Sequence, residues 1–450
     1  MKKYVEIMDM IHNKVIQGEF APGSRLPSIR ALSEVASCSI NTVIKAYQEL
    51  EQRHVIYSVP QSGYYVVKDH RPVLKRSEDE PLIDFHSAGP DYKLMPYIDY
   101  KHCINEAIDF YKENMFAYSD IQGLPSLRNE LAQQLQELQV FTNPDRIIVV
   151  TGSQQALHLL ISLPFPNGKH AICVEQPTHP SMIESLRHQK ARTIGIEIHR
   201  DGPDLQQLEY FFQNEDIKFF YTVSRFHNPT GYSYSNKQRK RIVELAQKYD
   251  VFIVEDDYMG DLDHNKKQDP MFAFDPSGRV IYTKSFSKVL LPGLRLGLAV
   301  LPESLKENFL RGKFGMDVHT PVLTQGALEI YLKSGMYGAH IGKLRSLYHQ
   351  KGKIVQQSYQ HYLPSNTVYT GSNSGFYSSI QLPYPLKANP FIHRVKKDGV
   401  LLESMEEMYL PDFKKFNTVR LSVSQVDKHL IPKGIQKIGK AIEVLLKSQV

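Results

Sequence analysis

Apolar and polar residues alternate with helical spacing at the start of the chain and then with strand spacing. Over residues 3–17 apolar side chains recur every three or four positions, as on one face of a helix, and Gly18 ends the pattern. Ser28 and Ser39 precede two further helical stretches, which they are predicted to cap. Two short strands with a turn at 60–63 follow. Three helices and a hairpin predict a winged helix-turn-helix.

The third predicted helix has an apolar face and a polar face. Its apolar stripe consists of Ile40, Val43, Tyr47 and Leu50. Asn41, Thr42 and Lys45 project from the opposite side. Because a helix with an exposed polar face is shaped to enter a DNA major groove, this helix is predicted to contact DNA.

Beyond the winged helix, the pattern changes twice. Residues 69–82 are charged, poor in large apolar groups and rich in proline near both ends, so they are predicted to form a linker. After them, helical patterns alternate with short β-rich runs such as RIIVV, HAICV, FFYTV, VFIVED and RVIYT. Such alternation predicts an α/β fold with parallel strands and crossover helices. The expected domains are 1–68, 83–450, and within the latter a large domain at about 115–335 and a small α+β domain at about 336–450.

Composition places the chain among ordinary globular proteins. It has 450 residues, of which 42% are hydrophobic and 23% charged. No apolar run approaches the roughly 20 residues of a membrane helix, and acidic residues stand where a signal peptide would be apolar, so a cytoplasmic protein is expected. Cys38, Cys103 and Cys173 lie far apart, which predicts reduced core residues and neither a metal site nor a disulfide framework.

Positive charge is concentrated at the N-terminus. The whole chain carries a net charge of +6, and residues 1–76 contain 11 Lys and Arg against 7 Asp and Glu. That segment therefore has a net charge of 11 − 7 = +4, which leaves 6 − 4 = +2 for the rest. The excess suits an electrostatic contact with DNA, although four charges alone are weak evidence.

The stretch GEFAPGSRLPSIRALSEVASCSINTVIKAYQELEQ resembles the GntR-type winged helix along nearly its whole length. It contains that family's PG.RLPS.R.L and S..TV..AY..L patterns. The resemblance and the exposed helix face together give the candidate DNA-binding residues Arg25, Arg30, Ser39, Asn41, Thr42, Lys45 and Gly63. Two positions depart from the family: Asn41 stands where Arg is frequent, and His54 where Gly usually ends the helix. These departures leave the operator sequence open.

The remainder of the chain resembles the fold-type I pyridoxal-phosphate enzymes, the aspartate aminotransferase superfamily, because several motifs appear in that family's order. Pyridoxal 5'-phosphate requires a lysine for its aldehyde, an acid for its ring nitrogen and an anion site for its phosphate. Lys288 in SFSK matches the Schiff-base lysine. Asp256 in FIVEDDY matches the acid, while Tyr258 and Asn228, the latter in HNPTG, match the groups at the phenolic oxygen.

The phosphate site is expected where TGSQQALHLL begins a helix, since free backbone N–H groups at a helix start attract anions. The implied phosphate ligands are Gly152, Ser153, Gln154, Ser285, Ser287 and Arg295. Tyr118 resembles a tyrosine that family dimers lend to the partner's phosphate.

Three further residues are implied around the same pocket. Arg420 in TVRLSVS resembles the arginine that binds a substrate α-carboxylate. Gly89 in SAGPD would line the pocket with backbone. His179 in EQPTHP stands where the family usually stacks an aromatic ring on the cofactor.

A GntR-type winged helix joined to an aminotransferase-like domain is the layout of the MocR subfamily of bacterial regulators. The resemblance implies a homodimeric transcription regulator that binds double-stranded operator DNA and senses a small amine, an amino acid or the vitamin itself through pyridoxal phosphate at Lys288. Two alternatives stay open. One is an active aminotransferase, or one capable of half-transamination, with an accessory DNA-binding domain; the other is a regulator that binds a ligand in a pocket without cofactor.

Overall fold

The computed structural model describes residues 3–53, 55–67, 82–199, 201–265, 268–371 and 374–448. The chain divides into two compact units, here called the N-terminal unit (Met1–Asp79) and the C-terminal unit (Glu80–Val450). Except for Leu82, the predicted linker lies outside the described residues, as does His54. Within the described part of the chain, no helix combines the length and apolar character needed to cross a bilayer.

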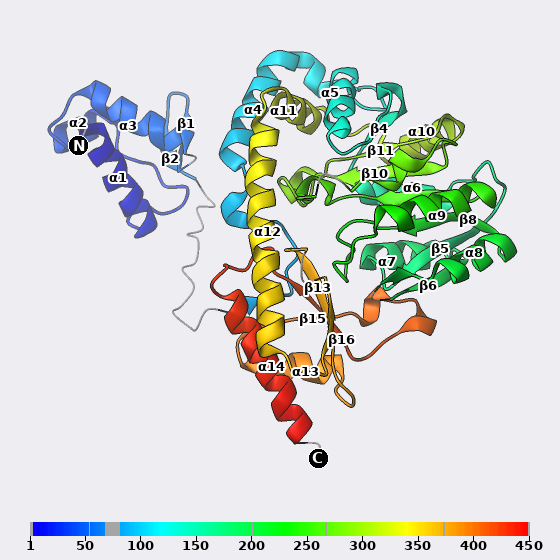
Figure 1. Ribbon diagram of the computed structural model, residues 1–450. Coiled ribbons are helices and arrows are strands. Elements are labelled where there is room, and N and C mark those ends of the chain that lie inside the picture. Colours follow the sequence, from blue (N-terminus) through cyan, green and yellow to red (C-terminus); the bar gives the residue numbers. More distant parts are fainter. Residues whose placement is uncertain are drawn as a thin grey trace. The chain divides into compact units, whose positions relative to one another are not determined.

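The N-terminal unit is a winged helix, as predicted (Figure 1). Its elements are α1 (Lys3–Ile16), α2 (Ile29–Val35), α3 (Ile40–Gln52), β1 (Ile56–Val59) and β2 (Gly63–Val66). The two strands form an antiparallel hairpin in which Ile56 pairs with Val66. Ser28 caps α2 by accepting from the Ala31 N–H at 3.2 Å, and Ser39 caps α3 by accepting from the Thr42 N–H at 3.2 Å.

The core of this unit forms between α1 and α3. Val43, Tyr47 and Leu50 are fully buried, as the apolar stripe predicted. Ile40 is 48% exposed, so its assignment to the stripe was wrong. It is the first residue of α3, and Ala46 contributes to the buried face instead.

The C-terminal unit is built on an eight-stranded sheet with the order β4-β11-β10-β9-β8-β5-β6-β7. Its strands are β4 (Ile147–Val150), β5 (Ala171–Gln176), β6 (Thr193–His199), β7 (Gly202–Pro203), β8 (Ile217–Thr222), β9 (Phe252–Asp256), β10 (Val280–Ser285) and β11 (Gly297–Val300). Neighbours from β10 to β6 pair in parallel. The antiparallel β11 lies between β10 and β4. The five β-rich runs of the sequence correspond to β4, β5, β8, β9 and β10.

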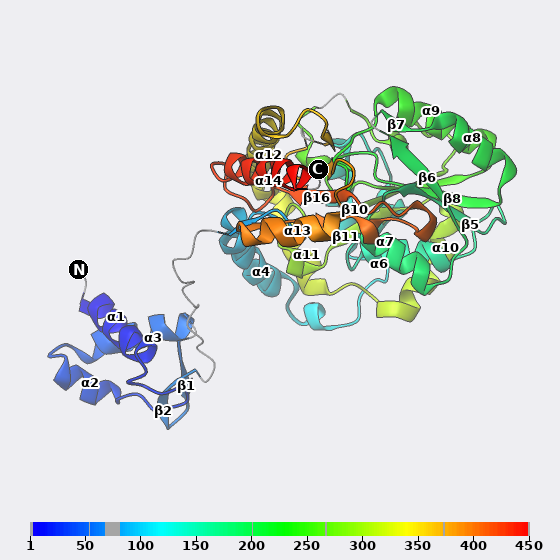
Figure 2. The ribbon, with the colours of Figure 1, turned by 90° about the horizontal axis from the view of Figure 1, so that it is seen from below.

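Helices cover both faces of this sheet because successive strand residues point to opposite sides. On β5, Cys173 packs in a cluster with Leu208 and Ile242, whereas Ile172 packs in another with Met182. Figure 2 shows α8 and α9 on one face, and α6, α7 and α10 on the other. The bounds are α6 (Ser153–Ser162), α7 (Pro180–His188), α8 (Leu205–Asn214), α9 (Asn236–Lys248) and α10 (Glu303–Asp317).

A smaller sheet with the order β12-β13-β16-β15 forms the second part of this unit. Its strands are β12 (Val368–Thr370), β13 (Tyr377–Gln381), β15 (Glu403–Ser404) and β16 (Thr418–Ser422). The long helix α12 extends from the large sheet to this small one, as Figure 1 shows. The remaining helices and strands are α4 (Tyr97–Tyr111), α5 (Pro125–Gln136), α11 (Val322–Lys333), α12 (Met336–Tyr362), α13 (Ala388–Lys397), α14 (Ile431–Lys447), β3 (Ile83–Asp84) and β14 (Val400–Leu401). The α/β fold with a smaller α+β part is therefore confirmed.

Candidate functional site

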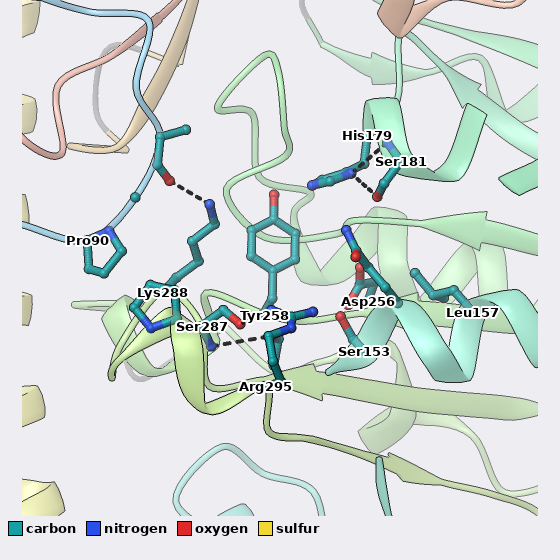
Figure 3. Close-up of a pocket in the computed structure, with 15 residues that line it drawn as sticks. Pro90, Ser153, Leu157, His179, Ser181, Asp256, Tyr258, Ser287, Lys288 and Arg295 are labelled. Carbon is teal, nitrogen blue, oxygen red and sulfur yellow. Dashed lines mark hydrogen bonds between the residues drawn. The ribbon is translucent and has the colours of Figure 1, made fainter. Parts of the chain in front are cut away.

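A cavity of about 310 Å³ opens where β4, β9 and β10 end. It is lined by Ala88, Gly89, Pro90, Ser153, Gln154, Leu157, His179, Ser181, Asp256, Tyr258, Ser285, Ser287, Lys288, Pro292 and Arg295 (Figure 3). Nine of these were predicted from the sequence as cofactor or Schiff-base residues, and Gly89 as an effector residue. The carboxyl ends of parallel strands meet at one edge of a sheet, which is why motifs far apart in the chain converge here.

One side of the cavity is an anion cradle. Gly152 precedes α6 with φ 77°, and a Cβ atom there would lie 2.7 Å from Nη2 of Arg295. Only glycine allows the guanidinium to come this close to the helix start. Arg295 donates from Nη1 to Oγ of Ser287 at 3.2 Å, and the backbone N–H of Ser287 donates to Oγ of Ser285 at 3.2 Å. A guanidinium, hydroxyls and a helix N-terminus together suit a phosphate.

A buried carboxyl group, that of Asp256, ends β9 at the floor of the cavity. It accepts hydrogen bonds from the Tyr221 hydroxyl at 3.2 Å and the Thr283 hydroxyl at 3.1 Å. Burial raises the pKa of Asp256 to about 7, and the neighbouring Asp257 adds to the effect. A cation bound next to this carboxyl would favour its ionised form, so the site suits a protonated ring nitrogen.

The side chains above that floor are Tyr258 and His179. The Tyr258 hydroxyl is buried and has no hydrogen-bond partner among the described residues. Figure 3 shows it pointing into the cavity between Lys288 and His179. A ligand oxygen in the cavity would satisfy this hydroxyl, so the residues fit a ligand with a polar atom at this place.

His179 lines the cavity as a neutral ring. Burial and the positive charges of Lys288 and Arg420 lower its pKa to about 3. Its Nδ1 accepts from the Ser181 N–H at 3.2 Å and lies 2.7 Å from the Ser181 Oγ, so in the neutral ring Nε2 carries the proton. His179 is therefore an uncharged donor.

Lys288 lies opposite this histidine. Its Nζ donates to the carbonyl oxygen of Ala88 at 2.5 Å. The adjacent Gly89 also lines the cavity, and a Cβ atom there would lie 2.6 Å from Nε2 of Gln425. The segment before Pro90 thus holds the lysine amine at the cavity wall (Figure 3).

Four predicted residues do not line the cavity, and one of them, Gly152, lies at the start of α6 next to Arg295. Asn228 and Arg420 are buried beside it and bound to each other, with Nη1 of Arg420 donating to Oδ1 of Asn228 at 3.1 Å. The charge of Arg420 still acts on the cavity, since it lowers the pKa of His179. Tyr118 is 88% exposed and lies away from the cavity of its own chain.

Two buried ion pairs near the ends of β9 and β10 were not predicted from the sequence. Lys284 on β10 pairs with Asp261, and both side chains are almost completely buried. Asp257 pairs with Arg225, which lowers the pKa of Asp257 although burial opposes this. These pairs tie the segment after β9 to β10 and to the loop after β8. Asp257 could have been noticed because it stands next to Asp256 in the DDY motif, but no pattern in the sequence indicates that Arg225 is its partner.

Also unforeseen were the lining residues Ala88, Pro90, Leu157, Ser181 and Pro292. Of these, only Ser181, two positions after His179, carried a signal, because its hydroxyl stands next to a motif histidine.

The predicted DNA-binding side chains lie on the surface of the N-terminal unit. Arg25, Arg30, Asn41 and Lys45 are exposed, and Thr42 is half-buried. The Lys45 Nζ lies 4.6 Å from the ring centre of Tyr4, so part of this lysine is held against α1.

The other two predicted residues have local structural roles as well. Ser39 is engaged in capping α3. Gly63 has φ 112°, a conformation that favours glycine, at the start of β2 next to the Arg25 guanidinium.

Two family models match the chain. Residues 3–66 match the bacterial regulatory proteins of the gntR family, and residues 91–438 match aminotransferase class I and II. The uncharacterized HTH-type transcriptional regulator YcxD of Bacillus subtilis is 44% identical over 97% of this chain and 99% of its own length. The chain belongs to the MocR subfamily, in which a GntR-type domain is fused to an aminotransferase class I and II domain.

Some relatives of this MocR protein are named as aminotransferases. The 2-aminoadipate transaminase of Thermus thermophilus is 28% identical over 84% of this chain and 94% of its own. The structure of Pyrococcus horikoshii kynurenine aminotransferase, solved with PMP, is similar with a TM-score of 0.75, 27% identity, and coverage of 82% of this chain and 92% of that one. These likenesses support the fold of the C-terminal unit.

Proposed function

We propose that this chain is a transcription regulator that binds operator DNA through its N-terminal unit and pyridoxal 5'-phosphate in the cavity of its C-terminal unit. The observation that carries the proposal is the convergence of five groups on one cavity. They are the α6 N-terminus, the Arg295 guanidinium, the buried Asp256 carboxyl, the unpartnered Tyr258 hydroxyl and the Lys288 amine. This set offers one donor or charge for each polar part of the cofactor.

Each residue has a role that follows from its surroundings. The first N–H groups of α6 and Arg295 bind the phosphate, and the Asp256 carboxylate holds a proton on the ring nitrogen. The Tyr258 hydroxyl donates to the phenolic oxygen, and Asn228, beside the cavity, assists it. His179 covers the ring as a neutral donor rather than as a base, because its pKa of about 3 keeps it unprotonated near neutral pH.

When bound, pyridoxal phosphate supplies an aldehyde that bonds reversibly to a primary amine. Lys288 is the resident amine of the cavity, and it is held at 2.5 Å from the Ala88 carbonyl oxygen. An effector amine that took the place of Lys288 at this aldehyde would leave the lysine side chain free. Effector binding is thereby coupled to contacts of Lys288 with the segment around Ala88.

We infer that the effector is a small amine or amino acid and that its binding changes the affinity for DNA. Arg25, Arg30, Asn41 and Lys45 are exposed donors on the winged helix, which suits contacts with phosphates and base edges. An effector can shift the DNA affinity only by its differential affinity for the two states of the protein, typically about 1–3 kcal/mol.

A homodimer is part of the same proposal. Tyr97, Ile98 and Phe110 of α4 are each more than half exposed, at 65%, 66% and 74%. Phe116 and Tyr118 follow them with 82% and 88% exposure. Exposed aromatic and aliphatic side chains gathered on one segment are typical of an interface, and Tyr118 would then be available to the partner's phosphate site.

Lys288→Ala tests the proposal. The full-length variant should lose the visible absorption band of the lysine-bound cofactor and the response of operator binding to the effector. Its operator affinity without effector should stay within about twofold, because Lys288 lies in the other unit. Lys240→Ala, an exposed lysine on α9, is the control and should behave as the wild type. An unchanged effector response in Lys288→Ala would contradict the mechanism.

Aminotransferase turnover is the second candidate function. It is favoured by the presence of Lys288 and Asp256 and by the similarity to 2-aminoadipate transaminase. Steady-state turnover of an amino acid with an oxo acid at about 10 per second, an ordinary enzyme rate, would support this alternative. Turnover slower by several orders of magnitude, together with effector-dependent DNA binding, would favour the regulator.

A further inference from the structure

Arg420, the residue expected to hold a ligand carboxylate, is already paired with a carboxylate of its own chain. It lies on β16 directly opposite Glu403 on β15. Nη2 of Arg420 and Oε2 of Glu403 form an ion pair in which the arginine side chain is 7% exposed and the glutamate side chain 28%. Among the ion pairs of the described residues, Glu403 takes part in this one alone. Glu403 therefore pairs with Arg420 across two neighbouring strands.

Two further contacts use donors of Arg420, whereas its buried Nε has no hydrogen-bond partner among the described residues. Nη1 donates to Oδ1 of Asn228 at 3.1 Å, and Nη2 also donates to the His86 carbonyl oxygen at 3.3 Å. The guanidinium lies 5.3 Å from the ring centre of Tyr377, and the Nζ of Lys288 lies 5.9 Å from the same centre. Arg420 and the Lys288 amine therefore lie near the same aromatic ring, and the charge of Arg420 is already balanced by Glu403.

This arrangement penalises a ligand that carries an α-carboxylate. Such a group reaching Arg420 would either share the guanidinium with Glu403, where two negative charges repel, or push Glu403 away from a mostly buried partner. A ligand without that carboxylate meets neither obstacle. Its amine reaches the cavity, while the Arg420–Glu403 pair stays intact.

We propose that Glu403 neutralises Arg420 and makes the cavity selective for primary amines that lack an α-carboxylate. The inference rests on the proposed function, whose effector class it narrows. Glu403 acts here as a specificity-determining residue, because it acts on the ligand through the arginine that would otherwise bind it.

The test compares 1-butylamine with L-norvaline, which is the same butylamine chain carrying an α-carboxylate. Each is titrated into the full chain loaded with pyridoxal phosphate, and binding is followed through the visible absorbance of the cofactor. Wild type should bind 1-butylamine more tightly than L-norvaline. Glu403→Gln keeps the side-chain size and removes its charge, so it should improve L-norvaline binding by about tenfold while changing 1-butylamine binding by less than about twofold.

Two controls separate the effect of the lost Glu403 charge from an effect on folding. Glu407→Gln makes the same charge change four positions away, on a side chain that is 65% exposed and pairs with Lys414, and it should leave both dissociation constants unchanged. An unaltered cofactor absorption band in Glu403→Gln shows that the cavity has formed. If that band is lost, Glu403→Asp, which retains the charge, should retain the band and the preference for the amine.

The possible results distinguish a failure of the proposed selectivity from a failure of the proposed function. If the wild-type protein forms no cofactor absorption band, both the proposed function and the selectivity role of Glu403 are wrong. If the band forms but L-norvaline binds wild type at least as tightly as 1-butylamine, or if Glu403→Gln leaves the ratio of the two constants unchanged, the selectivity role of Glu403 is wrong and the proposed function stands.

Discussion

Apart from the exposed Arg295, the two units place their functional side chains in opposite ways. In the N-terminal unit the candidate contacts, such as Arg25, Asn41 and Lys45, are exposed on a small winged helix. In the C-terminal unit Asp256, Asn228 and Arg420 are buried by 94% or more and are bound to other protein groups. A pocket concentrates binding energy in a few desolvated groups, whereas a DNA-binding surface spreads it over many solvated ones.

This difference predicts that single substitutions have large effects in the cavity and small effects on the winged helix.

Arg295→Gln should have the largest effect. Hydrogen bonds from a charged group contribute about 1.5–3 kcal/mol, so its loss should weaken pyridoxal phosphate binding by about 10- to 100-fold. Spectroscopic titration of the cofactor-free protein measures this. Arg311→Gln, on a 78% exposed side chain of α10, is the matched control and should bind the cofactor normally. Equal affinities for the two variants would place the phosphate elsewhere.

Asp256→Asn should have an intermediate effect that depends on pH. Because the folded-state pKa of Asp256 is raised to about 7 from 3.8, the stability that this carboxyl contributes is fully present below pH 3.8 and is lost as the pH rises through about 7. The variant has no carboxyl group at this position, so its stability does not fall in this way as the pH rises. Without cofactor, its Tm relative to wild type should therefore increase by about 3 °C or more between about pH 5 and about pH 8.

Thermal unfolding at several pH values checks this difference. Added pyridoxal phosphate should reduce it in the wild type, because a protonated ring nitrogen stabilises the ionised carboxylate. A Tm difference that does not vary with pH would show that Asp256 is ionised at neutral pH even without a cationic partner.

Lys45→Ala should have the smallest effect. Removing one solvent-exposed charge that binds a DNA phosphate should weaken operator binding by about fivefold and reduce the slope of log affinity against log salt concentration by about 0.9. Binding measured at several salt concentrations gives both values, with Lys240→Ala as the control. An unaltered salt slope would mean that Lys45 binds no phosphate. A loss of operator affinity as large as the loss of cofactor affinity in Arg295→Gln would contradict the contrast between the units.

Local signals predicted the secondary structure wherever a few neighbouring residues decide it. Ser28 and Ser39 cap their helices as expected because a cap depends on the next two or three residues. The short strand β11 (Gly297–Val300) was missed, since four residues next to the Lys288 motif show little pattern of their own. Ile40 was placed on the wrong face because helical spacing does not reveal where a neighbouring helix stops covering the surface.

Motif residues of the site were predicted more fully than their partners. Lys288, Asp256 and Arg295 stand in recognisable local patterns, and the structure brings them to one cavity. The partners of the buried charges were not foreseen. Glu403 precedes Arg420 by 17 positions in the chain, and only the pairing of β15 with β16 makes them neighbours.

The sequence by itself determined the winged helix, the α/β class and the residue types of the cavity, because capping, periodicity and motif chemistry are read over short stretches of chain. Tertiary structure alone decided which charges neutralise each other, as in Arg420 with Glu403 and Lys284 with Asp261. The physical reason is that an electrostatic interaction depends on distance and burial, and strand register and packing set both among residues far apart in the chain.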